Sequence, residues 1–141
     1  MIEVHTMPIA IPWLLTLAAA VVYFVLGAVW YGYFGEQWMR ELGKRKEQLQ
    51  TNDPTPFVIA FLSSLLNAIA VALVLNWVIP LTETRLLAAF VTALLLGGAV
   101  VAAALAKHYA FAHWSWRLFA IDTGYDLVGF LLMSLLLAFM R

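Results

Sequence analysis

The sequence predicts an all-α integral membrane protein, a bundle of four transmembrane helices that run up-down-up-down. The chain is 65% hydrophobic and 11% charged, with a mean hydropathy of +0.91, whereas soluble domains are about 45–50% apolar and about 25% charged. Four apolar runs are each close to the roughly 20 residues that a helix needs to cross a bilayer. None of them alternates between polar and apolar residues, and Ala and Leu dominate, so strands are not indicated.

The predicted spans are residues 11–34, 57–79, 86–106 and 118–140 of one membrane domain, 1–141. Each must be a helix, because unpaired backbone groups cannot face lipid. The first stretch, residues 1–13, lacks the basic start of a signal peptide, and the apolar run behind it lacks a clear cleavage site. We therefore expect the first span to be retained.

The connections between the spans carry their own signals. Residues 35–55 form a charged, helix-prone loop that we expect to be a helical extension of the first span or an interfacial helix. Thr55 is a candidate N-cap for the second span, with Pro56 as its first helical residue. Residues 80–85 are a short turn, and residues 107–117 are a short aromatic loop with Ser115 as a candidate cap of the fourth helix.

The basic residues predict an orientation. One side of the predicted bundle holds six of them, and Arg85 and Arg141 fall on the other; the six are Arg40, Lys44, Arg45, Lys46, Lys107 and Arg117. The positive-inside rule then puts both polar loops in the cytoplasm and both termini outside. The run from Lys44 to Lys46 is a candidate contact for anionic lipid, although acidic neighbours favour a plain topology signal.

Several classes of function find no support in the sequence. The formal net charge is zero, so no nucleic-acid footprint is visible, and the absence of cysteine removes thiol chemistry. Ser63 and Ser64 lack the surroundings of a hydrolase nucleophile. His108 and His113 lack a third ligand at a known zinc spacing, and no glycine-rich phosphate loop is present. We therefore expect no bound metal and no cofactor.

The fourth span carries two carboxylates at membrane depth, Asp122 and Asp126. An ionisable group there is expensive and usually faces the bundle interior. At about 1.5 Å per residue, Asp122 lies roughly 6 Å deep, Asp126 roughly 12 Å, Asn67 about 15 Å and Tyr23 about 16 Å. We expect Tyr23, Asn67 and Asp126 to point inward. The candidate ligand- or ion-binding residues are Asp122, Asp126, Asn67, Tyr23, Tyr31, Trp30, Tyr125 and Ser63.

The two acids allow a functional and a structural interpretation. They lie four residues apart on one helix face, so they could relay protons, bind a cation, or hold a metal together with His108 or His113. Alternatively, Asp122 caps the start of the helix, and Asp126 only hydrogen-bonds Asn67 or Tyr23. Stripes of small residues supply close helix packing or interfaces of a homo-oligomer; they are Ala89, Ala93 and Gly97, then Ala99 and Ala103, and Ala28 and Gly32.

Two segments, residues 24–43 and 119–133, resemble the bacterial membrane family known as domain of unknown function 1761 (DUF1761). The first segment fits its FxLGxxWY and FGxxWM pattern through Phe24, Leu26, Gly27, Trp30, Tyr31, Phe34, Gly35, Trp38 and Met39. The second fits its IDxGY motif through Ile121, Asp122, Gly124 and Tyr125. The resemblance implies four spans over nearly the whole chain, a place in the inner membrane of a bacterium, and no known activity. Members often have His in place of Asp126, which favours Asp122 as the acid of the motif.

The depth estimate and the resemblance both suggest a contact between the first and fourth helices. In this contact, Trp30 and Tyr31 donate hydrogen bonds to the Asp122 carboxylate. Three functions stay open. The first is a homo-oligomeric protein that binds or transports a small solute, an ion or a proton through its polar layer. The second is a structural or accessory membrane protein. The third is an enzyme for lipid head groups that uses Asp122, His108 and His113.

Overall fold

The computed structural model describes residues 10–49 and 52–141, which form helices with no strand in that part of the chain. The predictions for residues 1–9 lie outside the described residues. In order, the elements are α1 (Trp13–Leu42), α2 (Lys46–Leu49), α3 (Thr55–Val78), η1 (Ile79–Leu81), α4 (Arg85–Ala93), η2 (Leu94–Ala102), α5 (Ala103–Ala112) and α6 (Trp116–Met140). They make four membrane-length helical runs, since α3 continues into η1, and α4, η2 and α5 are continuous. The predicted fold class is confirmed.

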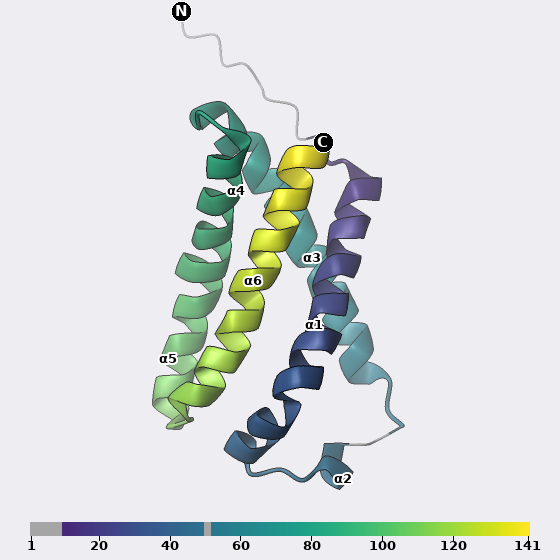
Figure 1. Cartoon of the computed structure of the whole chain (residues 1–141), viewed down its shortest axis with the longest axis vertical. Helices are drawn as coiled ribbons and strands as arrows, with labels where there is room; N and C mark the ends of the chain where they lie inside the picture. Colours follow the sequence, from purple (N-terminus) through teal and green to yellow (C-terminus); the bar gives the residue numbers. More distant parts are fainter. Residues whose placement is uncertain (1–9, 50–51) are drawn as a thin grey trace, which may run out of the picture.

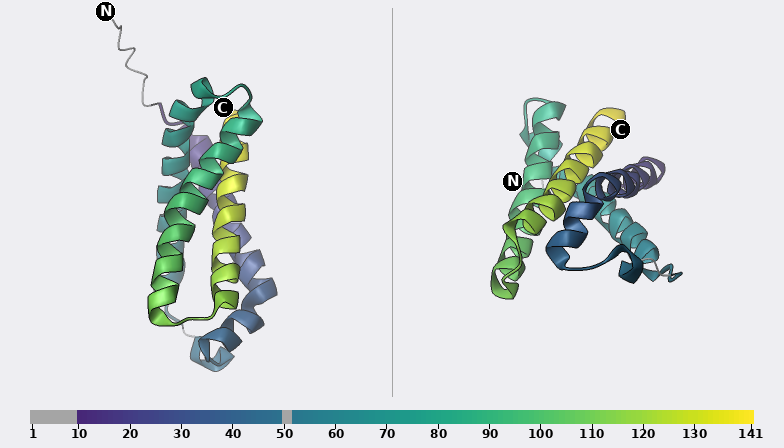
Figure 2. Two further views of the ribbon diagram at one scale, coloured as in Figure 1. Left: turned by 90° about the vertical axis from the view of Figure 1, so that its left-hand side faces the viewer. Right: turned by 60° about the horizontal axis from the view of Figure 1, so that its bottom comes forward.

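The helices run alternately up and down, and α6 lies against all the other long helices (Figures 1 and 2). One end of the bundle holds α2 and the turn between α5 and α6; we call it the basic end. The other holds the start of α1, the connection from α3 to α4 and Arg141; we call it the terminal end. The α6 helix, with its two carboxylates, therefore packs against every other long helix, while its remaining face is exposed at Leu127, Leu132 and Phe139.

The terminal half of the bundle is tightly packed. Its small core residues are almost wholly inaccessible and let the helices approach closely; they are Ala19, Ala20, Ala68, Ala72, Ala88, Ala89, Ala93 and Ala138. Between them lie the larger buried side chains Val71, Leu75, Met133 and Leu137. The outer surface is rich in exposed Leu, Val and Phe, as expected where lipid rather than water is the solvent.

The first helix extends well beyond the span predicted from hydropathy. It continues to Leu42 and ends at Gly43, whose φ of 68° is left-handed and whose N–H bonds the carbonyls of Arg40 and Met39. Glycine suits this position because it has no Cβ to clash. The expected helical extension is therefore present, and it carries Trp38 back over the bundle.

The start of α3 corrects a predicted cap. Thr55 is the first helical residue rather than the N-cap, and Pro54 occupies the cap position. The Asp53 carboxylate accepts a hydrogen bond of 3.0 Å from the Thr55 N–H. Residues 55–60 are all exposed, so the first turns of α3 do not enter the core. The bundle is consequently more open at its basic end.

The third span also differs from the predicted one. The segment η2 is a π-helix with Gly97 and Gly98 at its centre, and helical structure continues through much of the predicted aromatic loop to Ala112. His113 then ends α5 in a left-handed conformation, with φ of 54°. The predicted cap is present, since the Ser115 hydroxyl accepts from the Arg117 N–H at 3.1 Å.

Candidate functional site

The Asp122 carboxylate lies at the centre of a hydrogen-bonded cluster near the basic end. Its Oδ1 accepts from the Tyr31 hydroxyl at 2.6 Å and from the Trp38 indole N–H at 3.2 Å. Its Oδ2 accepts from the hydroxyl of Tyr109, which is buried. The donors come from α1 and α5, so one carboxylate joins three helices. It does not act as the cap of α6, because Ser115 has that role.

Trp30 makes a different contact from the expected one. Its indole N–H donates to the backbone carbonyl of Ile121 at 2.9 Å, not to the Asp122 carboxylate. Trp38, two turns further along α1, supplies the indole donor to the carboxylate instead. Sequence reasoning missed Trp38 and Tyr109 because both were assigned to loops; the extensions of α1 and α5 are what bring them to the site.

The two sequence motifs fit into each other across the α1–α6 interface. A Cβ on Gly124 would lie 3.0 Å from the Trp30 ring, and one on Gly27 would lie 2.9 Å from the Tyr125 hydroxyl. That hydroxyl donates to the Tyr23 carbonyl at 3.1 Å. Each glycine thus leaves room for an aromatic side chain of the other helix, which explains in physical terms why both motifs combine glycines with aromatic residues.

Asp126 forms a second, deeper contact. Its Oδ1 accepts from the hydroxyl of Tyr23, and the Tyr23 ring stacks on Tyr125 with centroids 4.8 Å apart. Tyr125 in turn meets Tyr31 edge to face at 5.5 Å. A layer of three tyrosine rings therefore connects the surroundings of Asp126 with those of Asp122.

Two candidate residues on α3 do not join this layer. Ser63 is exposed, and Ser64 is the buried serine, bonded to the Ala60 carbonyl at 2.8 Å. Asn67 is half-buried and makes no side-chain hydrogen bond with any described residue. Of the two partners predicted for Asp126, Asn67 or Tyr23, the structure has the bond to Tyr23. The face of α3 that enters the core holds Ser64, Ala68, Val71, Ala72 and Leu75.

A groove of about 640 Å³ lies beside the Asp122 cluster, between α1, α2 and the start of α3. Its lining is mainly apolar and consists of Tyr31, Gly35, Trp38, Met39, Leu49, Asp53, Pro56, Phe57 and Ala60. Two of these residues, Tyr31 and Trp38, also donate to Asp122. Among the described lining residues, Asp53 alone is charged, and hydrogen bonding to the side chain and the backbone amide of Thr55 lowers its pKa. The groove thus combines an aromatic wall with an ionised carboxylate.

Neither membrane-embedded acid has a basic partner within residues 10–49 and 52–141. The ion pair in this part of the chain joins Arg117 to Glu41 at 4.0 Å, away from both acids. No group of three or more metal-type side chains comes together among the described residues. His108 and His113 are exposed, and neither is hydrogen-bonded to Asp122.

Four long apolar helices, one of which carries two carboxylates, define a multi-pass membrane protein. The chain belongs to the family described as "Protein of unknown function (DUF1761)", whose profile matches residues 14–138. No match was found among curated proteins or solved structures.

Proposed function

We propose that the protein binds a small cationic solute or a proton at its basic end, through the groove and the acids behind it. One observation carries this proposal: Tyr31 and Trp38 form the groove wall and at the same time donate to Asp122. A molecule in the groove therefore lies one side chain away from the carboxylate. The volume is within the range of about 300–1,000 Å³ that is typical of small-molecule sites.

The two carboxylates at membrane depth suggest that the ligand is positively charged. Carboxylates at membrane depth are expensive unless they are paired or neutralised, and neither Asp122 nor Asp126 is paired with a basic side chain of the described residues. Aromatic rings such as Trp38 and Tyr31 attract cations over their faces, and Asp53 adds a carboxylate to the groove. A proton or a compact cationic group supplies the missing charge.

A complete passage through a single copy is not supported. Val71, Leu75, Met133 and Leu137 are fully buried and fill the core between Asp126 and the terminal end. Transport therefore requires a path between copies in a homo-oligomer. The stripe of Ala89, Ala93 and Gly97 is used inside the bundle, whereas the small residues that remain exposed for such an interface are Ala28, Gly32, Ala99 and Ala103.

Proton flux into proteoliposomes, followed with an enclosed pH-sensitive dye under a potassium diffusion potential, tests this function. We expect wild type to exceed empty liposomes and Asp126→Asn to lower the flux about tenfold or more, as for loss of a relay group. Tyr33→Phe is the matched control, because Tyr33 lies on α1 but is 82% exposed. Flux that is equal in wild type and Asp126→Asn would rule out Asp126 as a proton carrier.

A structural or accessory role is the second candidate, favoured by the three donors that saturate Asp122. In that case Asp122→Asn lowers the melting temperature in detergent, while wild type gives no flux above empty liposomes. A lipid head-group enzyme is less favoured, because the two histidines do not contact the acid. We retain the inner membrane of a bacterium and cytoplasmic polar loops as parts of the proposal, on the charge bias of the loops.

A further inference from the structure

Two arginines from different helices meet at the terminal end of the bundle. Arg141, directly after α6, donates to the Ala72 carbonyl at 3.2 Å, to the Ala10 carbonyl at 3.4 Å and to the Asn76 side chain. Arg85, at the start of α4, donates to the Ala138 carbonyl. Both guanidinium groups line one pocket of about 310 Å³, together with Leu75, Asn76, Ile79 and Pro80.

The two positive charges repel each other. Partial burial and the nearby charge of Arg85 lower the pKa of Arg141. Within residues 10–49 and 52–141, neither arginine forms an ion pair with a carboxylate side chain. A guanidinium has five N–H donors, and the bond to Ala138 uses only one of those on Arg85. The pocket therefore offers unused donors and a net positive charge to an anion.

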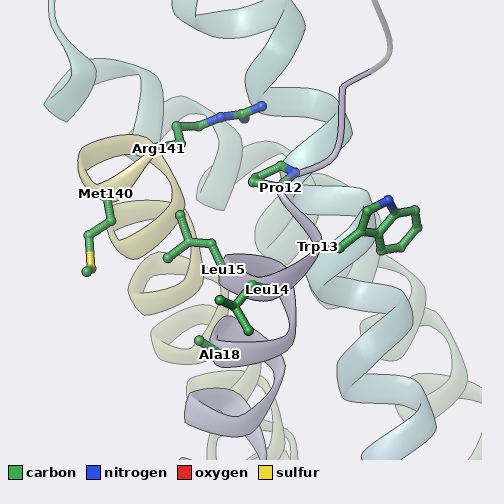
Figure 3. Close-up of a pocket in the computed structure, with 7 residues that line it drawn as sticks. All are labelled: Pro12, Trp13, Leu14, Leu15, Ala18, Met140 and Arg141. Carbon is green, nitrogen blue, oxygen red and sulfur yellow. The ribbon is translucent and has the colours of Figure 1, made fainter.

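An apolar hollow of about 550 Å³ adjoins the same arginine. It lies between the start of α1 and the end of α6, and its lining consists of Pro12, Trp13, Leu14, Leu15, Ala18, Met140 and Arg141. Figure 3 shows Arg141 extending from the end of α6 toward Pro12, above the leucines and Ala18. Trp13 and Trp77 are exposed at this end of the bundle, where tryptophan marks the level of the lipid head groups.

We propose that Arg85 and Arg141 bind the phosphate of an anionic phospholipid, with an acyl chain lying in the apolar hollow beside α1. A phosphate favours paired arginines because the planar guanidinium matches its oxygens. The adjoining hollow favours a lipid over free phosphate, since inorganic phosphate has no apolar part to place there. This site is separate from the groove at the basic end, so it holds whether or not that groove binds a solute.

Native mass spectrometry of the detergent-purified full chain tests the site. The protein is mixed with phosphatidylglycerol or phosphatidylcholine, and the fraction that retains one lipid is measured. We expect phosphatidylglycerol to be preferred, and the double variant Arg85→Gln/Arg141→Gln to retain it about tenfold less than wild type, as for loss of charge-assisted hydrogen bonds. The double variant Lys44→Gln/Lys107→Gln is the control, because it also removes two positive charges, at exposed positions of the basic end.

Two further measurements address folding and the source of the phosphate. Ala18→Trp keeps both arginines but fills the hollow, so we expect it to lower phosphatidylglycerol retention, while Ala28→Trp, exposed elsewhere on α1, does not. Inorganic phosphate at millimolar concentration should leave the melting temperature of wild type unchanged. Stabilisation by inorganic phosphate without a preference for phosphatidylglycerol would overturn the lipid proposal. Equal retention by wild type, the double variant and Ala18→Trp would overturn the site itself.

Discussion

Asp122 is satisfied by donors that lie far from it in the sequence. Tyr31 and Trp38 are separated from it by 91 and 84 residues, and Tyr109 by 13. In a bilayer the unfolded alternative also finds partners, so each interhelical hydrogen bond is worth about 0.6 kcal/mol on average and up to about 1.7. Bonds to a charged acceptor belong to the upper part of that range.

At this scale we predict that Tyr31→Phe lowers the free energy of unfolding by about 1–2 kcal/mol, because it removes a donor from a partly buried carboxylate. Tyr33→Phe makes the same chemical change two residues away on an exposed side chain, and it should stay within about 0.5 kcal/mol. Unfolding in mixed micelles with increasing sodium dodecyl sulfate measures both. Equal effects of the two variants would contradict the role given to the Tyr31 hydroxyl.

The sequence predicted part of the site for physical reasons. A carboxylate in an apolar span needs a partner, which pointed to Asp122, Asp126 and the tyrosines near their depth. Trp38 was not expected there, because its segment could be either an extension of the first span or an interfacial helix, and the extension is what brings Trp38 to Asp122. Asn67 was placed by depth alone, and depth does not decide which of two residues at a similar level, Asn67 or Tyr23, bonds Asp126.

At the scale of elements, the α1–α6 contact depends on glycines opposite aromatic rings. A Cβ on Gly129 would overlap the Tyr23 ring, whereas a Cβ on Gly32 would meet nothing within 4 Å. The ring that Gly129 admits is the one whose hydroxyl bonds Asp126. The absence of a side chain at Gly129 therefore allows both the close approach of α1 and α6 and the hydrogen bond from Tyr23 to Asp126.

We predict that Gly129→Ala lowers the free energy of unfolding by roughly 1–3 kcal/mol, because Tyr23 must leave its position. Gly32→Ala should be neutral or slightly stabilising, since alanine favours an exposed helical site. Unfolding in detergent measures the stability of both variants. The position of the Tyr23 ring is followed by NMR of labelled tyrosine, because tryptophan obscures tyrosine fluorescence. Equal effects of the two changes on stability would contradict the role given to the Tyr23 ring.

Hydropathy predicted the number and type of the long helices correctly, because backbone N–H and C=O groups in lipid must form their hydrogen bonds within the helix. It placed their ends poorly where aromatic and charged residues follow, at residues 35–42 and 107–112. It gave no sign of the π-helix η2, which depends on an i→i+5 bonding pattern rather than on composition.

The whole molecule is asymmetric along its axis. The terminal half is filled by small and branched apolar residues, while the basic half holds the acids, the tyrosines and the groove. The connections lie at opposite ends: residues 43–49, 52–54 and 113–115 share one end, and residues 82–84 lie at the other.

Because the chain contains no cysteine, single cysteines can report this asymmetry. We predict that Lys46→Cys and His113→Cys resist a membrane-impermeant maleimide in intact cells and react after lysis, as the positive-inside rule requires. Leu81→Cys, 83% exposed at the opposite end, should react in both conditions. Val71→Cys, inside the packed half, should react in neither. Labelling of all three exposed positions from outside would contradict the proposed orientation.

Trp38 has a consequence for the behaviour of the assembled helices. Its indole lies in the groove wall and also bonds Asp122, which is the acceptor that anchors Tyr109 of α5. Binding equilibria that share a residue are linked reciprocally. A ligand that moves the indole away from the carboxylate removes one of the three donors that hold Asp122, and so changes the bond between Asp122 and Tyr109. By the same reciprocity, a displacement of α5 changes the affinity for that ligand, so the third and fourth membrane-length runs respond to binding beside the first.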